Sequence, residues 1–299
     1  MLKMFESRDI SSFRYYYCDP SLAAAVVFVS LFAITTILHL VQLIRKRTWY
    51  FIPFVIGGIF ETIGYIGRTV SATQTPNWTL NPYIIQTLLL LIAPALFAAS
   101  VYMILGRIVR LVDGAPHSII PVQWLTKIFV ATDVISFFMQ GAGGGMLSSA
   151  KNQSGLELGE NIIIGGLVVQ LVGFSVFIVV ASIFHWRTVR QPTEASRTIA
   201  VDWQRFMYVL YAVSALILVR SVFRTVEYAQ GFGGSLQQSE VWLYVFDATL
   251  MFLASALLVV WHPSQIVAGR GRARGNMSSE YVSEEGFSMQ QTTPYRAVP

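Results

Sequence analysis

Charged residues are scarce in this chain of 299 residues, where Asp, Glu, Lys and Arg together make up 12% of the sequence. Soluble domains carry roughly 25% charged residues, and a soluble globule of this size needs them to cover its surface. Residues of the hydrophobic set reach 54% instead. The composition excludes a cytosolic enzyme, a basic nucleic-acid binder and a disordered chain, and it predicts a membrane protein.

Several chemical motifs are also missing. Cys18 is the only cysteine, so an intrachain disulfide and a cysteine-based metal site are excluded. The sequence contains no GxxxxGK[ST] loop for ATP, no HExxH pair and no GxSxG elbow. The histidines His39, His117, His185 and His262 lack the spacing of metal ligands and are interpreted as packing or interfacial residues. We therefore expect no cofactor and no metal, and we disfavour an intramembrane enzyme.

Long apolar runs dominate what remains. A helix needs roughly 20 apolar residues to cross the hydrocarbon layer, and backbone groups in lipid must pair within the helix. Seven segments qualify as spans: residues 22–44, 49–70, 83–105, 122–147, 162–184, 206–226 and 241–261. The sequence predicts an all-α integral membrane protein, a seven-transmembrane-helix bundle over residues 21–262.

The basic residues of the connections predict the orientation. The N-terminal segment and the loops on its side hold four Lys and Arg, whereas the other loops and the C-terminal tail hold thirteen. Because cytoplasmic loops are enriched in Lys and Arg, we expect an extracellular N-terminal segment (residues 1–20) and a cytoplasmic, disordered tail (residues 263–299). Asn77 and Asn152 begin N-x-Ser/Thr sequons in predicted outside loops and are candidate glycosylation sites.

The start of the tail carries a basic cluster formed by Arg270, Arg272 and Arg274. Such a cluster beside a span acts first as a determinant of topology. It also predicts weak binding to anionic lipid of the inner leaflet.

Polar residues within the spans are the candidate functional residues, because each charge near a helix centre costs about 2.5–3.5 kcal/mol. They are Glu61, Arg68, Asp133, Gln140, Arg220, Arg224, Glu227 and Asp247. Their helical spacing and depth allow them to meet, and we expect Asp247 to lie within ion-pair reach of Arg220 or Arg224. Two interpretations stay open: a polar lock that holds the bundle together, and a polar substrate path.

Glycine and proline residues occur within these spans. Glycine permits either close helix approach or helix unwinding, and for the run at residues 141–145, near the polar patch, we expect unwound backbone lining a cavity. Pro94 predicts a kink in the third span.

Five motifs carry a resemblance to a known family. They lie at residues 53–68, 93–107, 133–145, 220–231 and 240–247, and the matching stretch ends at His262-Pro263. In this order they resemble the fungal RTA-like family of seven-helix, lipid-translocating exporter-like proteins. The resemblance implies a fungal plasma-membrane protein that exports sphingoid bases or related amphiphiles and contributes to resistance to toxicants.

The leading hypothesis is therefore a translocator of lipids or amphiphilic small molecules. Glu61, Asp133 and Asp247 would accept an ammonium head group, while the arginines would set the ionisation of these acids or bind a phosphate head. The alternative is a seven-helix sensor or receptor-like protein that regulates lipid or stress responses, since the same topology fits it.

Overall fold

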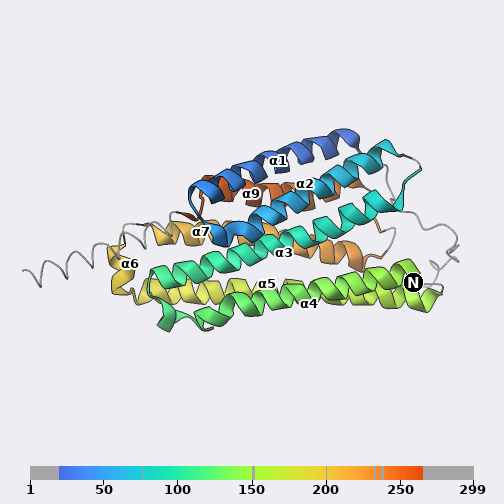
Figure 1. Cartoon of the computed structure of the whole chain (residues 1–299). Coiled ribbons are helices and arrows are strands. Elements are labelled where there is room, and N and C mark those ends of the chain that lie inside the picture. Colours follow the sequence, from blue (N-terminus) through green and yellow to red (C-terminus); the bar gives the residue numbers. More distant parts are fainter. Residues whose placement is uncertain are drawn as a thin grey trace, which may run out of the picture.

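The computed structural model describes residues 20–264, except residues 76, 150, 151, 200, 232, 233, 237 and 238. Its described part contains helices and no strand. Seven helices are long and apolar enough to cross a membrane (Figure 1), which confirms the predicted all-α, seven-helix fold. Most of the predicted N-terminal segment, and the tail from residue 265 with Arg270, Arg272 and Arg274, lie outside the described residues.

The spans follow one another in a simple order. They are α1 (Leu22–Arg45), η1 (Trp49–Phe51) with α2 (Ile52–Thr73), α3 (Leu80–Leu111), α4 (Val122–Ser149), α5 (Gln153–Arg190), α7 (Trp203–Ala229), and α8 (Glu240–Leu243) with η3 (Tyr244–Thr249) and α9 (Leu250–Val260). The short elements η2 (Ala115–His117) and α6 (Glu194–Thr198) lie in the connections before α4 and α7.

Most helices extend beyond the predicted spans, because hydropathy marks the apolar stretch and not the helix ends. Polar caps set the true starts. The Asn152 side chain accepts a hydrogen bond from the backbone N–H of Gly155, so α5 begins well before residue 162. In the same way Asp202 caps α7 through the N–H of Arg205. Such caps satisfy backbone donors that the first helical turn leaves unpaired.

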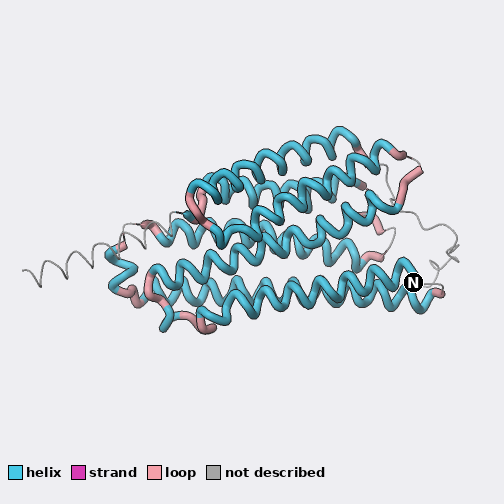
Figure 2. The backbone as a smooth tube through the Cα atoms, viewed as in Figure 1, coloured by secondary structure: helices cyan, strands magenta, loops and turns pink. Residues whose placement is uncertain are grey.

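Consecutive helices pack against each other: α1 on α2, α2 on α3, α4 on α5, and α7 on α9. Figure 1 shows α4 and α5 along one side of the bundle and α1, α2 and α9 along the other, with α3 between them. The connecting loops gather at the two ends (Figure 2). We call the end where α8 begins the Glu240 end, and the opposite one the His262 end.

The two kinds of surface differ as expected in a membrane. Aromatic rings fill the interior, where Phe54 and Phe97 stack with their centroids 4.1 Å apart. The outward faces instead carry apolar side chains, and Ile34, Phe138 and Val179 are each more than half exposed. Extended apolar surface of this kind is rare on soluble monomers, and it is suited to contact with lipid.

The expected unwinding at residues 141–145 is wrong, because α4 is helical from Val122 to Ser149. Gly143 faces α5, and a Cβ atom placed on it would lie 2.7 Å from the carbonyl oxygen of Gly159. A Cβ on Gly166 would likewise lie 2.9 Å from the carbonyl oxygen of Ser136. Small residues let membrane helices approach closely, so glycine at residue 143 serves helix packing.

Candidate functional site

Seven charged side chains gather inside the bundle toward the Glu240 end, and we call them the buried charge cluster. All but Glu240 are buried, and the Glu240 side chain is only 13% exposed. They come from α2, α7 and the seventh span, and they are Glu61, Arg68, Arg220, Arg224, Glu227, Glu240 and Asp247.

Three ion pairs account for six members of the cluster. Arg220 Nε donates to Asp247 Oδ1 at 2.5 Å, which confirms the predicted contact between the sixth and seventh spans. Arg224 Nη1 donates to Glu227 Oε2 at 2.9 Å within α7. Arg68 pairs with Glu240 and also donates from Nε to the Tyr244 hydroxyl. A buried charge that is paired and hydrogen-bonded avoids most of the cost of leaving water.

Glu240 and Tyr244 were missing from the residues selected by sequence. Glu240 is the first residue of its helix, a position where an acid usually faces water. One indication in the sequence could have pointed to Glu240. A buried Arg68 requires an acid at its own depth, and Arg68 lies near the end of α2 that meets α8.

Asp247 lies on a π-helical turn, η3. The wider turn leaves Tyr244, Asp247 and Ala248 buried on the inner face, and the Thr249 hydroxyl donates to the carbonyl of Tyr244 at 2.8 Å. Single π turns within α-helices occur frequently at functional sites. Here the turn presents an acid and a phenol to α2 and α7 together.

Pro94 contributes to the cluster through the carbonyl that it leaves free. Proline has no backbone N–H, so the carbonyl of Leu90, four residues earlier, loses its helical donor. Arg220 Nη2 from α7 donates to this carbonyl at 2.9 Å. Arg220 is therefore held by Asp247 on one side and by the proline-interrupted turn of α3 on the other.

Glu61 is the seventh member, and it has no ion-pair partner within the described part of the chain. The residue is only 2% exposed, yet it forms none of the three ion pairs. Its electrostatic neighbours are Asp247, Arg220 and Arg224. Two further groups near it, the Tyr65 hydroxyl and Arg224 Nε, are buried and have no hydrogen-bond partner in the described part of the chain.

Aromatic rings separate the cluster from α1. The rings of Phe28 and Tyr244 stack with centroids 5.3 Å apart, and those of Phe32 and Tyr65 with centroids 5.5 Å apart. Arg68 Cζ lies 5.3 Å from the centroid of Tyr244. Ring faces attract cations, so the Tyr244 ring adds to the stabilisation of the buried Arg68 charge.

Asp133 and Gln140 do not join this cluster, contrary to the expectation that all these groups meet. Gln140 Nε2 donates to Ser136 Oγ at 2.7 Å and to Gln170 Oε1 at 3.3 Å. Asp133 is buried beside Tyr102, and within the described ranges its Oδ2 has no hydrogen-bond partner. The reason is packing: α4 contacts α3 and α5, so α3 stands between these residues and α2.

The His262 end holds a second group of buried polar side chains. His39 Nε2 lies 3.1 Å from the carbonyl oxygen of Ser255, and the ring of His262 packs 5.3 Å from that of Phe51. Burial, aided by the positive charge of Lys46, lowers the pKa of His262 to about 4. In the described ranges, no three His, Cys, Asp or Glu side chains are placed to hold a metal.

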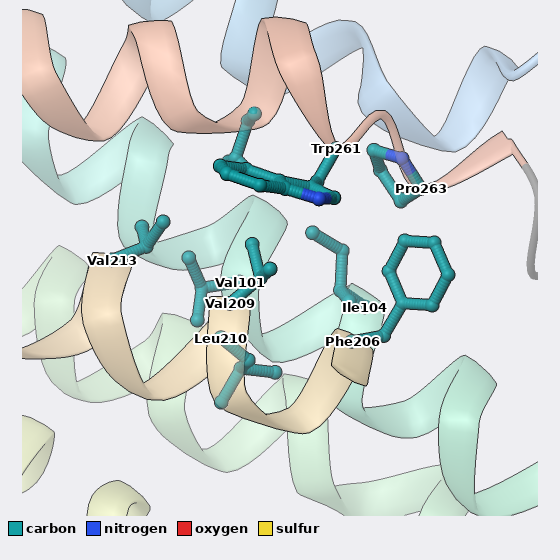
Figure 3. Close-up of a pocket in the computed structure, with 9 residues that line it drawn as sticks. Val101, Ile104, Phe206, Val209, Leu210, Val213, Trp261 and Pro263 are labelled. Atoms are coloured by element: carbon teal, nitrogen blue, oxygen red, sulfur yellow. The ribbon is translucent and has the colours of Figure 1, made fainter. Parts of the chain in front are cut away.

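An apolar crevice lies at the same end, between α3, α7 and the residues after α9. Figure 3 shows the Trp261 indole lying over Ile104, Val209 and Leu210. Its other lining residues are also nonpolar, so the crevice offers no charged contact comparable with those of the buried charge cluster.

Comparison with known proteins places the chain in a family. The family described as "RTA1 like protein" matches residues 54–270. Protoporphyrin uptake protein 1 of Saccharomyces cerevisiae is 37% identical over 278 residues, covering 81% of this chain and 90% of that protein. Protein RTA1 of the same species is 33% identical, covering 84% and 85%.

A more distant relative is the sphingoid long-chain base transporter RSB1 of Saccharomyces cerevisiae, which is 25% identical over 303 residues, covering 90% of this chain and 78% of that protein. Two of these relatives are named as an uptake protein and as a transporter, and none of the three is named as an enzyme. No solved structure matches the chain. The family match over most of the seven-helix region, with the matches to curated relatives, establishes that this multi-pass membrane protein belongs to the RTA1-like family.

Proposed function

We propose that the protein translocates amphiphiles with a cationic head group, such as sphingoid long-chain bases, and that Glu61 binds the ammonium head. The observation that carries this proposal is the excess of one acid in the buried charge cluster. The cluster contains four acids and three arginines, and each arginine forms an ion pair with an acid other than Glu61. A carboxylate that is buried and unpaired is costly, and a cationic ligand would relieve that cost.

The surroundings of Glu61 support the same class of ligand. The Tyr65 hydroxyl is buried and has no hydrogen-bond partner among the residues that the structure describes, so it can accept a hydrogen bond from an ammonium group. The apolar outer faces of the helices allow the alkyl chain to stay in lipid while the head group enters the bundle. The relative named as a sphingoid long-chain base transporter adds independent support for this substrate class.

The roles assigned to the other acids differ. Asp247 is paired with Arg220 at 2.5 Å, so it holds the site together and does not itself accept the head group. Asp133 lies on the other side of α3 and cannot act on the same ammonium. Export to the outer leaflet, a plasma-membrane location and a contribution to toxicant resistance belong to this proposal as the cellular form of the activity.

The test is transport by purified full-length protein in proteoliposomes. The substrates are a labelled sphingoid base and its N-acetylated analogue, which has the same chain and no charge, with phospholipid and sterol probes for comparison. We expect protein-dependent movement of the base and not of the acetylated analogue. Glu61→Gln should lose this movement, whereas Glu157→Gln, an exposed acid on α5, should keep it.

Three outcomes would count against the proposal. Equal movement of the charged and acetylated substrates would show that no cation site is used. Retained movement in Glu61→Gln would remove Glu61 from the site. Absence of all movement, together with a ligand-dependent conformational change, would favour the sensor.

A further inference from the structure

The arginines in the buried charge cluster are fixed, which restricts how Glu61 can be neutralised. Each arginine already has an acid partner, and α1 and α3 carry their charged side chains, Arg45, Arg107 and Arg110, toward the His262 end. The charged groups that act on Glu61 are Asp247 on η3 and Arg220 and Arg224 on α7. Tyr65 on α2 neighbours Glu61 and is itself close to Arg68 and Tyr244.

An ionised, uncompensated carboxylate in this interior costs several kcal/mol, so the Glu61 carboxyl group must be neutralised. Two ways are open: it binds a proton, or it faces the ammonium group of a substrate. The two occupants use the same oxygen atoms and exclude each other. Asp247, Arg220 and Arg224 are close to Glu61, and the two arginines attract its carboxylate while Asp247 repels it.

We infer that Glu61 couples transport to protons by exchanging one proton for one cationic head group. This inference rests on the proposed function. The step conserves charge: the protonated carboxyl group and the ammonium ion give a carboxylate–ammonium pair and a free proton. The cycle reverses at the other side of the membrane, where a proton displaces the ammonium group. Both occupied forms are neutral overall, so the exchange is electroneutral and needs no ATP site.

The probe must not carry protons by itself. A sphingoid base diffuses across membranes as the neutral amine and follows any pH gradient without a protein. A base whose nitrogen is trimethylated stays positively charged at every pH, so its movement with a pH gradient reports the protein. We reconstitute the full chain in liposomes that contain a pH-sensitive dye, and we use headgroup accessibility to measure transfer of the probe from the outer to the inner leaflet.

Four results are expected. Inward movement of the probe makes the vesicle interior more alkaline, with one proton leaving per probe molecule. A pH gradient that is acidic inside speeds the movement, and a potassium diffusion potential does not change it. Glu61→Gln lowers both signals by roughly ten-fold or more, a factor that corresponds to about 1.4 kcal/mol of head-group binding. Asp133→Asn, which removes the other acid that is buried outside the ion pairs in the described part of the chain, leaves the proton coupling intact.

Failure of the proton exchange and failure of the proposed translocation give different results. If the probe moves with no dye signal and responds to the potential, the exchange is wrong and the proposed translocation stands. If wild-type protein moves neither the sphingoid base nor the trimethylated probe, the proposed function itself fails. If Asp133→Asn abolishes the proton signal while Glu61→Gln keeps it, the coupling residue is not Glu61. Thermal unfolding is measured first for both variants, to establish that each is folded before the transport results are interpreted.

Discussion

Replacing Arg220 by glutamine tests the physical basis of the buried charge cluster most directly. The change removes the ion-pair partner of Asp247 and the donor to the carbonyl of Leu90. Breaking a buried pair by removing one partner costs about 3–5 kcal/mol, and an unpaired buried carbonyl adds roughly 1 kcal/mol. Polar groups of an unfolded chain in a membrane also find partners, so we take the low end, about 3 kcal/mol.

The assay is thermal unfolding of the purified protein in one detergent. At roughly 2–4 °C per kcal/mol for a chain of this order of size, Arg220→Gln should lower Tm by about 6–12 °C. Arg197→Gln removes the same charge from an exposed position on α6, and a surface change of about 0.5 kcal/mol moves Tm by less than about 2 °C.

The pair is then tested as a pair. Adding Asp247→Asn to Arg220→Gln should cost little more, because it removes the carboxylate that has lost its partner. Equal Tm values for Arg220→Gln and Arg197→Gln would refute the assigned energy. Strictly additive losses in the double variant would refute the coupling.

Three further predictions address other parts of the molecule. Gly143→Ala should destabilise the protein by about 1–3 kcal/mol through overpacking against α5, whereas Gly144→Ala, whose Cβ meets nothing within 4 Å, should stabilise it by about 0.5–1 kcal/mol; Tm values of both variants check this. The pKa of His262 is about 4 in the folded state and near 6.5 when unfolded, so the unfolded state binds more protons between these pH values. Stability should therefore fall as pH drops from 6.5 toward 4, and His262→Asn should weaken this dependence. A C-terminal tag should resist protease added to intact cells, and cleavage of the tag would contradict the predicted orientation; glycans on Asn77 or Asn152, detected by a glycosidase-dependent change of mobility, would support it.

The sequence was sufficient for the fold and for one contact of the site. A helix that crosses lipid must be long and apolar, so hydropathy locates each span. The contact of Asp247 with Arg220 followed from the fixed rise of 1.5 Å per residue and from the short connection between the two spans, which makes them antiparallel neighbours. Depth along a helix is encoded locally, and both residues were placed by depth alone.

Which helices lie side by side was not encoded in this way. Asp133 has a depth that suits the cluster, but α4 packs on α3 and α5, and no local pattern states which helices are neighbours. The glycine run illustrates the same limit, since close packing and unwinding use the same residue type. Gly143 is distinguished from Gly144 only by the backbone of α5 that faces it.

The two interpretations left open by the sequence, a structural lock and a substrate path, apply to different members of one cluster. Arg220 is bonded to Asp247 and to the carbonyl that Pro94 leaves free, so releasing Asp247 to a substrate would strand a buried arginine. Among the described residues, Glu61 forms no ion pair that a substrate would have to break. Substitutions in the ion pairs should therefore lower stability first and transport as a consequence, whereas Glu61→Gln should impair transport while Tm stays within about 2 °C of wild type, since the amide is neutral and nearly the same size as the protonated carboxyl group that it replaces. If Glu61→Gln lowers Tm as much as Arg220→Gln, the fourth acid is also part of the lock, and both proton exchange and head-group binding must be assigned to other residues.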